Sequence, residues 1–260
     1  MTFEQEVLAV LSGGIVGFSL SLIGGGGSIL AVPLLLYLVG MPDPHLVIGT
    51  TAVAVAVNAA TGVIAHARRG NVRWATAAIF SAFGAVGAAI GSTIGKQFDG
   101  ESLLVLFAIL MIVIALLVLR RKADDAPNRE VLDGRSVAKL GGIGLGVGAL
   151  AGFFGIGGGF LIVPGLALAT GMPMIAAIGT SLISVTSFGL TTAANYALSG
   201  LVMWKVAGLF VVGGLGGGMA GARLAHRLAA RRRALAQVFS GVIIVVALYM
   251  LARSTGYLAG

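Results

Sequence analysis

Long apolar stretches without charged residues, separated by short polar segments, dominate the pattern of this chain. The first stretch runs for 34 residues, from Val7 to Gly40, without a charge. As one straight helix it would measure roughly 50 Å, whereas the hydrocarbon core of a bilayer is about 30 Å thick. The stretch must therefore bend or break, and its glycine cluster at residues 24–27 has the weakest helix preference. We expect an unwound turn there, between two short helices.

The same pattern returns in the second half of the chain. Residues 23–33 read IGGGGSILAVP, and residues 154–164 read FGIGGGFLIVP. The proline that ends each pattern cannot donate a backbone hydrogen bond, which adds to the tendency to interrupt a helix. Non-helical backbone at membrane depth is tolerated only where protein or water covers it. Each cluster therefore predicts a broken, re-entrant helical hairpin at a binding site or pathway.

Six further apolar runs reach the length of a bilayer-spanning helix. They cover residues 45–67, 74–95, 103–119, 175–198, 203–222 and 234–251. Hydrophobic residues make up 58% of the 260 residues and charged residues only 10%, which leaves too little polar surface for a soluble globule of this size. The sequence therefore predicts an all-α, multi-pass membrane protein.

An internal repeat relates the two halves of the chain. At an offset of 131 residues, Leu30, Val32 and Pro33 match Leu161, Val163 and Pro164. At an offset of 130, Ile48, Gly49, Thr50, Trp74, Phe80, Gly84, Gly87 and Gly91 match Ile178, Gly179, Thr180, Trp204, Phe210, Gly214, Gly217 and Gly221. We expect a first transmembrane repeat at 1–122, a charged cytoplasmic linker at 123–136 and a second repeat at 137–260. Each repeat would contain one broken hairpin and three spanning helices.

The distribution of Lys and Arg indicates how the two halves are oriented. Basic residues concentrate on the cytoplasmic side of membrane proteins. If each broken run crosses the membrane once, the halves are parallel, and 11 bases face inside against 6 outside. If each broken run returns to the face it came from, the halves are inverted, and 14 bases face inside against 3 outside. The inverted repeat has the stronger bias and is our prediction.

The net charge of +8 does not by itself indicate a nucleic-acid partner, because basic residues beside membrane helices are expected from the same bias. The absence of cysteine excludes thiol catalysis and cysteine-ligated metals. No spacing typical of metal ligands or of a catalytic triad is present. The segment Gly155-Ile156-Gly157-Gly158-Gly159 resembles a dinucleotide loop, but it lacks the preceding strand and the acidic residue about 20 positions later. We expect neither an enzyme nor a protein with a cofactor or metal.

Polar residues form a matching stripe in each repeat. Along 45–67, the positions of Thr51, Asn58 and Thr61 share one helical face, and the residues 130 positions later include Ser181, Thr191 and Asn195. Ser, Thr and Asn often hold membrane helices together by hydrogen bonds, so a purely structural role is the alternative for any single residue. We favour a pathway for the matched pair of stripes.

The chemistry of these positions suits an anion. No Asp or Glu lies deep within an apolar run, which argues against a cation substrate and against carboxylate-based coupling. The available groups are backbone N–H groups at the glycine clusters, helix N-termini and hydroxyls, all of which can bind an oxyanion. His45 and His66 are alternatives for carrying a proton. The candidate substrate-binding residues are Gly25, Gly26, Gly27, Ser28, Thr50, Thr51, Asn58, Gly157, Gly158, Gly159, Thr180, Ser181, Ser184 and Asn195.

The two glycine hairpins that end in Pro33 and Pro164, the segments 49–51 and 179–181, and the duplication together resemble the sulfite exporter TauE/SafE family of membrane transporters. The resemblance covers nearly the whole chain and implies transport of a sulfur-containing anion, such as sulfite or an organosulfonate, across the bacterial plasma membrane. We expect the two hairpins to meet near the membrane midplane and to bind the anion in an alternating-access transporter. A passive anion channel is the alternative. The expected partners are a small anionic substrate and the lipid bilayer, without nucleic acid, and a homodimer is left open.

Overall fold

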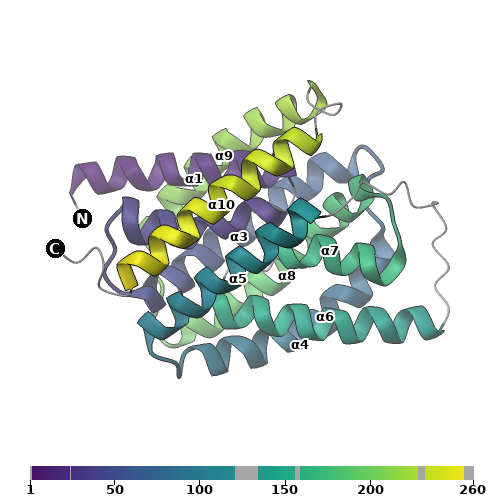
Figure 1. The fold of residues 1–260 in the computed structure, drawn as a ribbon, viewed down its shortest axis with the longest axis horizontal. Coiled ribbons are helices and arrows are strands. Elements are labelled where there is room, and N and C mark those ends of the chain that lie inside the picture. The colour runs from purple at the N-terminus through teal and green to yellow at the C-terminus, as the bar shows by residue number, and fades with distance from the viewer. Residues whose placement is uncertain (1, 24, 121–133, 156–158, 228–231, 255–260) are drawn as a thin grey trace.

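The computed structural model describes residues 2–23, 25–120, 134–155, 159–227 and 232–254. This part of the chain is helical and contains no strand (Figure 1). Its α-helices are α1 (Phe3–Ile23), α2 (Ala31–Pro33), α3 (Pro44–Ala67), α4 (Trp74–Gly95), α5 (Gly100–Arg120), α6 (Gly134–Phe154), α7 (Gly159–Thr170), α8 (Met174–Leu198), α9 (Trp204–Arg227) and α10 (Arg232–Ser254). A 3-10 helix, η1 (Gly25–Leu30), precedes α2, and a π-helix, η2 (Leu34–Leu38), follows it.

Hydrophobicity places the long helices almost where the apolar runs predicted them. The run 74–95 coincides with α4, and the runs 45–67 and 175–198 differ from α3 and α8 by one residue at the start. Six helices of the described part are long and apolar enough to cross a membrane, namely α1, α3, α4, α5, α6 and α8. The prediction of an all-α, multi-pass membrane protein is therefore confirmed. Most of the predicted linker, 123–133, lies outside the described residues, and α6 begins at Gly134.

The first long apolar run is interrupted at its glycine cluster, as predicted. After α1 the chain turns back, because Gly27 packs against the backbone of Ser19 and Leu20. It then follows α1 in the opposite direction until Val39, whose carbonyl oxygen accepts a hydrogen bond from Gln5 Nε2 at 3.3 Å. Pro33 lies inside this returning segment, just before the π-helical turn. The run thus forms a hairpin that returns to the end of the bundle where α1 begins.

The second apolar run is interrupted in a different way. α6 ends at Phe154, and Gly155 has a φ of +67°, a backbone conformation that residues with a side chain rarely adopt. A Cβ at Gly155 would also lie 1.9 Å from Ile48 Cγ2. Residues 156–158 lie outside the described part, and the chain then returns as the single helix α7. Gly165 of α7 faces Ile143 and Val147 of α6, so the two helices pack as a hairpin.

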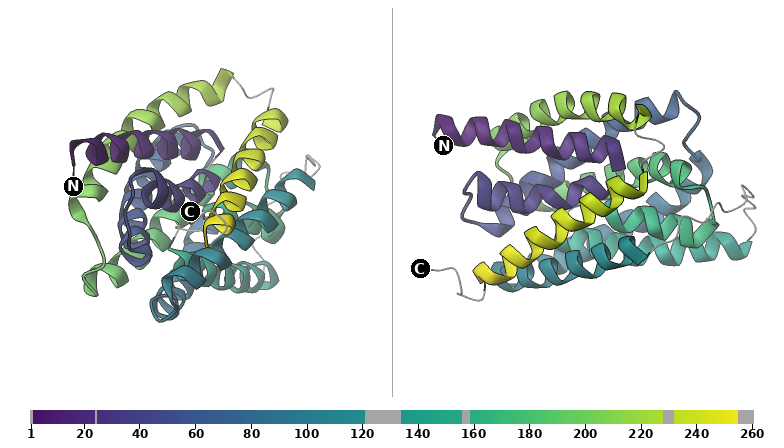
Figure 2. Two further views of the ribbon diagram at one scale, coloured as in Figure 1. Left: turned by 60° about the vertical axis from the view of Figure 1, so that its left-hand side comes forward. Right: turned by 45° about the horizontal axis from the view of Figure 1, so that its top comes forward.

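Helices from the two halves pair across the molecule, and α3 and α8 lie at its centre. The membrane-spanning windows of α3 and α8 are each 61% buried, against 33–44% for the other four candidate spans. α1 packs along α9 and α4 packs along α6, while α5 and α10 lie together on one face (Figures 1 and 2). In the internal repeat α1 corresponds to α6 and α9 corresponds to α4, so the pair α1–α9 and the pair α4–α6 are equivalent.

Glycine seams allow the paired helices to approach closely. In α4, a Cβ at Gly91 would lie 1.9 Å from the carbonyl oxygen of Ala149 in α6. In α9, a Cβ at Gly217 would lie 1.9 Å from the carbonyl oxygen of Gly14 in α1. Any side chain at these positions would push the backbones apart, which is how small residues at Gly-x-x-x-Gly spacing allow membrane helices to pack closely.

Contacts between α3 and α8 define two ends of the bundle. Gly49, near the start of α3, faces Leu201 after the end of α8, and Gly179, near the start of α8, faces Asn71 after the end of α3. α3 and α8 are therefore antiparallel. We call the end of the bundle that holds Gly49 and Leu201 the Lys96 end, because Lys96 follows α4 there. We call the opposite end the Asn71 end.

Candidate functional site

The two interrupted segments contact each other in the interior of the bundle. η1 from the first half packs against α7 from the second half, and both contact α8. Gly27, Ser28 and Gly159 are buried, whereas Gly157 and Gly158 lie outside the described residues. Gly25 and Gly26 form the first turn of η1. The predicted hairpins thus come together, but through their returning segments.

The glycine turns themselves lie toward opposite ends of the bundle. Gly27 packs on Leu20 near the end of α1, and the neighbouring Phe18 faces Gly221 far along α9, toward the Asn71 end. Gly155 faces Ile48 at the Lys96 end. The expectation that the turns meet near the midplane is therefore wrong. The turns lie apart because α1 and α6 each continue for 21 residues, or about 31 Å, before the chain turns.

Thr50 and Thr180 perform the same structural task in the two repeats. Thr50 Oγ1 accepts a hydrogen bond from the backbone N–H of Met203 at 3.0 Å, just before α9 begins. Thr180 Oγ1 accepts one from the backbone N–H of Arg73 at 3.0 Å, just before α4 begins. Each hydroxyl thereby satisfies a donor at the start of a helix from the other half. Both hydroxyls are fully buried.

Thr51 and Ser181 occupy equivalent positions in the two repeats, and their hydroxyl protons already form hydrogen bonds. Thr51 Oγ1 donates to the carbonyl oxygen of Ile48 at 3.0 Å, and Ser181 Oγ donates to that of Ile178 at 2.8 Å. In this arrangement each hydroxyl offers a ligand only its lone pairs, which do not suit an anion. Thr51 does share a helical face with Ile48, the residue that touches the second hairpin at Gly155.

Ser184 and Asn195 connect α8 to α4. Ser184 Oγ lies 2.9 Å from Ser81 Oγ in a buried hydrogen bond. The Asn195 amide donates to Ser92 Oγ at 2.6 Å, and its Oδ1 accepts from Lys96 Nζ at 2.7 Å. The hydrogen-bonding capacity of Asn195 is therefore taken up by side chains of the other half.

Asn58 differs from the other candidates, because its amide is buried without a partner. The residue is 4% exposed, and neither Nδ2 nor Oδ1 has a hydrogen bond in the described part of the chain. The amide packs on Gly214 of α9, where a Cβ would lie 2.0 Å from Nδ2. Gly214 also contacts Gly17 of α1, one turn before the residues that Gly27 touches. Asn58 is therefore close to the first hairpin.

Sequence reasoning missed Lys96 as a candidate residue. Its ammonium group lies among polar atoms of α8 at the Lys96 end, where it contacts both Asn195 and Ser199. These partners are about 100 positions away in the chain, so no local pattern reveals them. A lysine at the end of an apolar run is ordinarily an interfacial anchor, and only the fold shows that this one joins the two halves.

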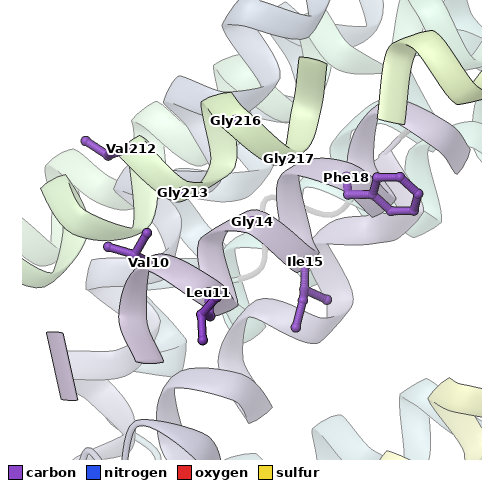
Figure 3. A pocket seen from close by; sticks show the side chains of 9 residues that line it. All are labelled: Val10, Leu11, Gly14, Ile15, Phe18, Val212, Gly213, Gly216 and Gly217. Atoms are coloured by element: carbon purple, nitrogen blue, oxygen red, sulfur yellow. The ribbon is translucent and has the colours of Figure 1, made fainter. Parts of the chain in front are cut away.

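An apolar groove opens on the outside of the bundle between α1 and α9 (Figure 3). Leu11, Ile15 and Phe18 from α1 and Val212 from α9 line it, together with glycines of both helices. Its lining has no charged or hydrogen-bonding side chain, so the groove has no donor with which to bind an anion. The interior contact of η1 and α7 remains the candidate site.

Comparisons with known proteins agree with this architecture. The family model described as sulfite exporter TauE/SafE matches residues 9–250. The chain is 52% identical over 258 residues to a probable membrane transporter protein of Xylella fastidiosa strain Temecula1, with 98% of each chain covered. It is 30% identical over 268 residues to the probable membrane transporter protein YunE of Bacillus subtilis, with 95% of this chain and 96% of the relative covered. No solved structure matches the chain.

The family match covers nearly all of the helices described above, from α1 to α10. The relatives named as membrane transporters are matched over almost their full length, so the likeness concerns the whole bundle and not one segment. This multi-pass protein of the bacterial cell membrane belongs to the sulfite exporter TauE/SafE family of membrane transporters.

Proposed function

We propose that this protein is a secondary transporter that carries a small sulfur-containing oxyanion, such as sulfite or an organosulfonate, by alternating access. The observation that carries the proposal is the interior contact between η1 and α7, the two interrupted segments of the two halves. Interrupted helices in a bilayer expose backbone groups only where protein or a water-filled path covers them. In transporters built from repeats, such segments surround the substrate.

The packing of the halves supports an inverted repeat. Contacts at the start of α3 recur at the start of α8 with an offset of 130, as in the pairs Gly49 with Leu201 and Gly179 with Asn71. A two-fold relation that makes α3 and α8 antiparallel has its axis perpendicular to these helices. For helices that span a bilayer, such an axis lies in the membrane plane, which is the arrangement that the Lys and Arg counts favour.

The donors available near η1 and α7 favour an anionic substrate. We propose that the anion contacts the backbone N–H groups of residues 25–28, those of residues 157–159 and the Asn58 amide one after another along the pathway, because the two glycine turns lie toward opposite ends of the bundle. Acidic residues in the described candidate spans are confined to the first turns of α1 and α5. An anion therefore meets donors in the interior and little competing negative charge. Thr50, Thr180, Ser184 and Asn195 would support the surrounding helices by the hydrogen bonds that they already make.

Transport into proteoliposomes tests the function. Purified protein should take up radiolabelled sulfite or sulfoacetate in a saturable manner, and sulfate and thiosulfate measured alongside would define the substrate class. Gly26→Leu and Gly158→Leu should abolish uptake in protein that still elutes as a folded species. Gly146→Leu is the matched control, because nothing lies within 4 Å of a Cβ at that position.

The passive channel makes opposite predictions. Uptake that rises linearly with anion concentration, or unitary currents in a planar bilayer, would favour the channel. Normal uptake by both the Gly26→Leu and the Gly158→Leu proteins would remove the glycine segments from the site. Absence of uptake for all four anions, in protein that is folded and correctly inserted, would refute the proposed function.

A further inference from the structure

A network of hydrogen bonds ties the two halves together at the Lys96 end. Lys96 Nζ donates to Asn195 Oδ1 at 2.7 Å, to Ser199 Oγ at 2.7 Å and to the Asn195 carbonyl oxygen at 3.2 Å. The Asn195 amide in turn donates to Ser92 Oγ at 2.6 Å and to Thr93 Oγ1 at 2.9 Å. We call these five residues the Lys96 latch, because residues 92–96 end α4 and residues 195–199 end α8.

The residues at the equivalent positions of the Asn71 end differ in chemistry from those of the latch. The repeat pairs Asn195 with Ala65, Ser92 with Ala222, Ser199 with Arg69, Thr93 with Arg223 and Lys96 with His226. Two alanines in place of an amide and a hydroxyl cannot form the same bonds. If the two halves exchange roles during transport, the same set of hydrogen bonds therefore cannot form at the Asn71 end. Such a difference between the two ends would favour closure at the Lys96 end in the resting protein.

The chemistry of Lys96 makes the latch sensitive to anions. Its partners are neutral oxygen atoms and the ring of Tyr196, whose centroid lies 5.9 Å from Nζ, and no carboxylate contacts it in the described part of the chain. Lys205 at the same end is instead paired with Glu6. The bonds from the ammonium group to these neutral oxygen atoms are charge-assisted, but only an oxyanion adds an attraction between opposite charges to the hydrogen bond. An oxyanion can therefore compete with Asn195 and Ser199 for the ammonium group.

We propose that Lys96 is a gate residue, which closes the Lys96 end while it is bonded to Asn195 and Ser199 and opens that end when an oxyanion takes their place. The proposal rests on the proposed transport function, because it assigns a gate to the same pathway. No covalent bond changes in this step. Lys96, Asn195 and Ser199 are only partly buried or exposed, so an anion from the aqueous side can reach them.

Cysteine labelling tests the latch directly, because the chain contains no native cysteine. Thr192 lies one turn deeper than Asn195 on α8, is fully buried, and its hydroxyl has no partner among the described residues, so Thr192→Cys is a mild reporter. The labelling rate of Cys at this position with an impermeant maleimide would be measured in purified protein. Glu101→Cys, at an exposed position of the same end, gives the rate for open access. Sulfoacetate serves as the anion, because sulfite itself reacts with maleimides.

In the Thr192→Cys protein we expect slow labelling that sulfoacetate accelerates by about tenfold. Lys96→Met and Asn195→Ala should each accelerate labelling without any anion, because each breaks the latch. Transport separates the two variants, since only Lys96→Met loses the positive charge. We expect Lys96→Met to raise the KM for sulfoacetate by about tenfold. Asn195→Ala leaves the ammonium group available and should not raise the KM in this way. Lys96→Arg, which keeps the charge, should retain the response to sulfoacetate.

If Lys96→Met does not change the labelling rate of the Thr192→Cys protein, the latch is refuted. A labelling rate that stays constant when sulfoacetate and sulfate are each added would overturn displacement by anions. Failure of the transport function looks different: no anion would be taken up, while Lys96→Met would still accelerate labelling in the absence of any anion.

Discussion

Replacing Asn58 by leucine separates the two roles left open for the polar stripes, a ligand contact and a structural hydrogen bond. Leucine has nearly the shape of asparagine but no polar group. Asn58 is 4% exposed, and both polar atoms of its side chain lack partners in the described structure. At the equivalent position of the other repeat, Phe188 packs on Gly84 just as Asn58 packs on Gly214. An apolar side chain is therefore compatible with this position in the fold.

The expected gain in stability follows from the missing hydrogen bonds. A buried amide without a partner costs about 1–3 kcal/mol, which Asn58→Leu removes. For a chain of this length, each kcal/mol shifts the Tm by about 2–4 °C. The variant should therefore unfold at a Tm that is about 2 °C or more above that of the parent. If Asn58 contacts the anion, the same variant should lose transport.

Asn195→Leu is the matched control, because the same substitution is made at an amide that is fully bonded. It leaves Lys96 Nζ, Ser92 Oγ and Thr93 Oγ1 each short of a partner, so the Tm should fall. Thermal unfolding of the three proteins would be followed by intrinsic fluorescence in one detergent, and sulfoacetate uptake would be measured in proteoliposomes. A lower Tm for Asn58→Leu, or normal uptake by it, would refute the reasoning and make the Asn58 amide a structural group.

Four further substitutions test the packing of the bundle. Gly91→Ala should lower the free energy of unfolding by about 1–3 kcal/mol, because its Cβ would lie 1.9 Å from a carbonyl oxygen of α6. Gly146 faces open space, so Gly146→Ala should raise the free energy of unfolding by up to about 1 kcal/mol. Urea unfolding in detergent measures both changes. Thr180→Val removes the acceptor for the Arg73 N–H and should cost about 0.5–2 kcal/mol, with faster amide hydrogen exchange confined to the start of α4. Gly155→Ala should lower the Tm because a side chain there is strained at φ +67°, and a Tm equal to that of the parent would show that the turn can relax.

The positions of the helices were predictable because they depend mainly on where apolar runs begin and end. α4 starts and stops with its run, at Trp74 and Gly95, where polar and charged loops take over. The interruption after Ile23 was predictable for a similar reason, because four consecutive glycines remove helix preference locally. These features are properties of short segments, and they need no knowledge of neighbours in space.

The depth of the turns and the partners of the polar residues could not be read in this way. Nothing in the glycine pattern says that α1 extends through 21 residues before the chain turns back, so the turn was expected near the middle of the membrane. The partners of Asn195 and Thr180 lie about 100 residues away in the chain. Such contacts depend on which helices pair, and that choice is made by the glycine seams between α1 and α9 and between α4 and α6.

The duplication itself indicates which residues deserve functional tests. Positions where the two repeats agree carry out the same structural work twice, as Thr50 and Thr180 do at the starts of α9 and α4. Matched polar residues were expected to line the pathway, but the matched hydroxyls are engaged with backbone groups. The repeats differ where Asn58 stands opposite Phe188 and where Asn195 stands opposite Ala65. The fold accepts an apolar side chain at each of these positions in one of the two repeats, so the polar residue in the other repeat must be explained by something that the fold alone does not require.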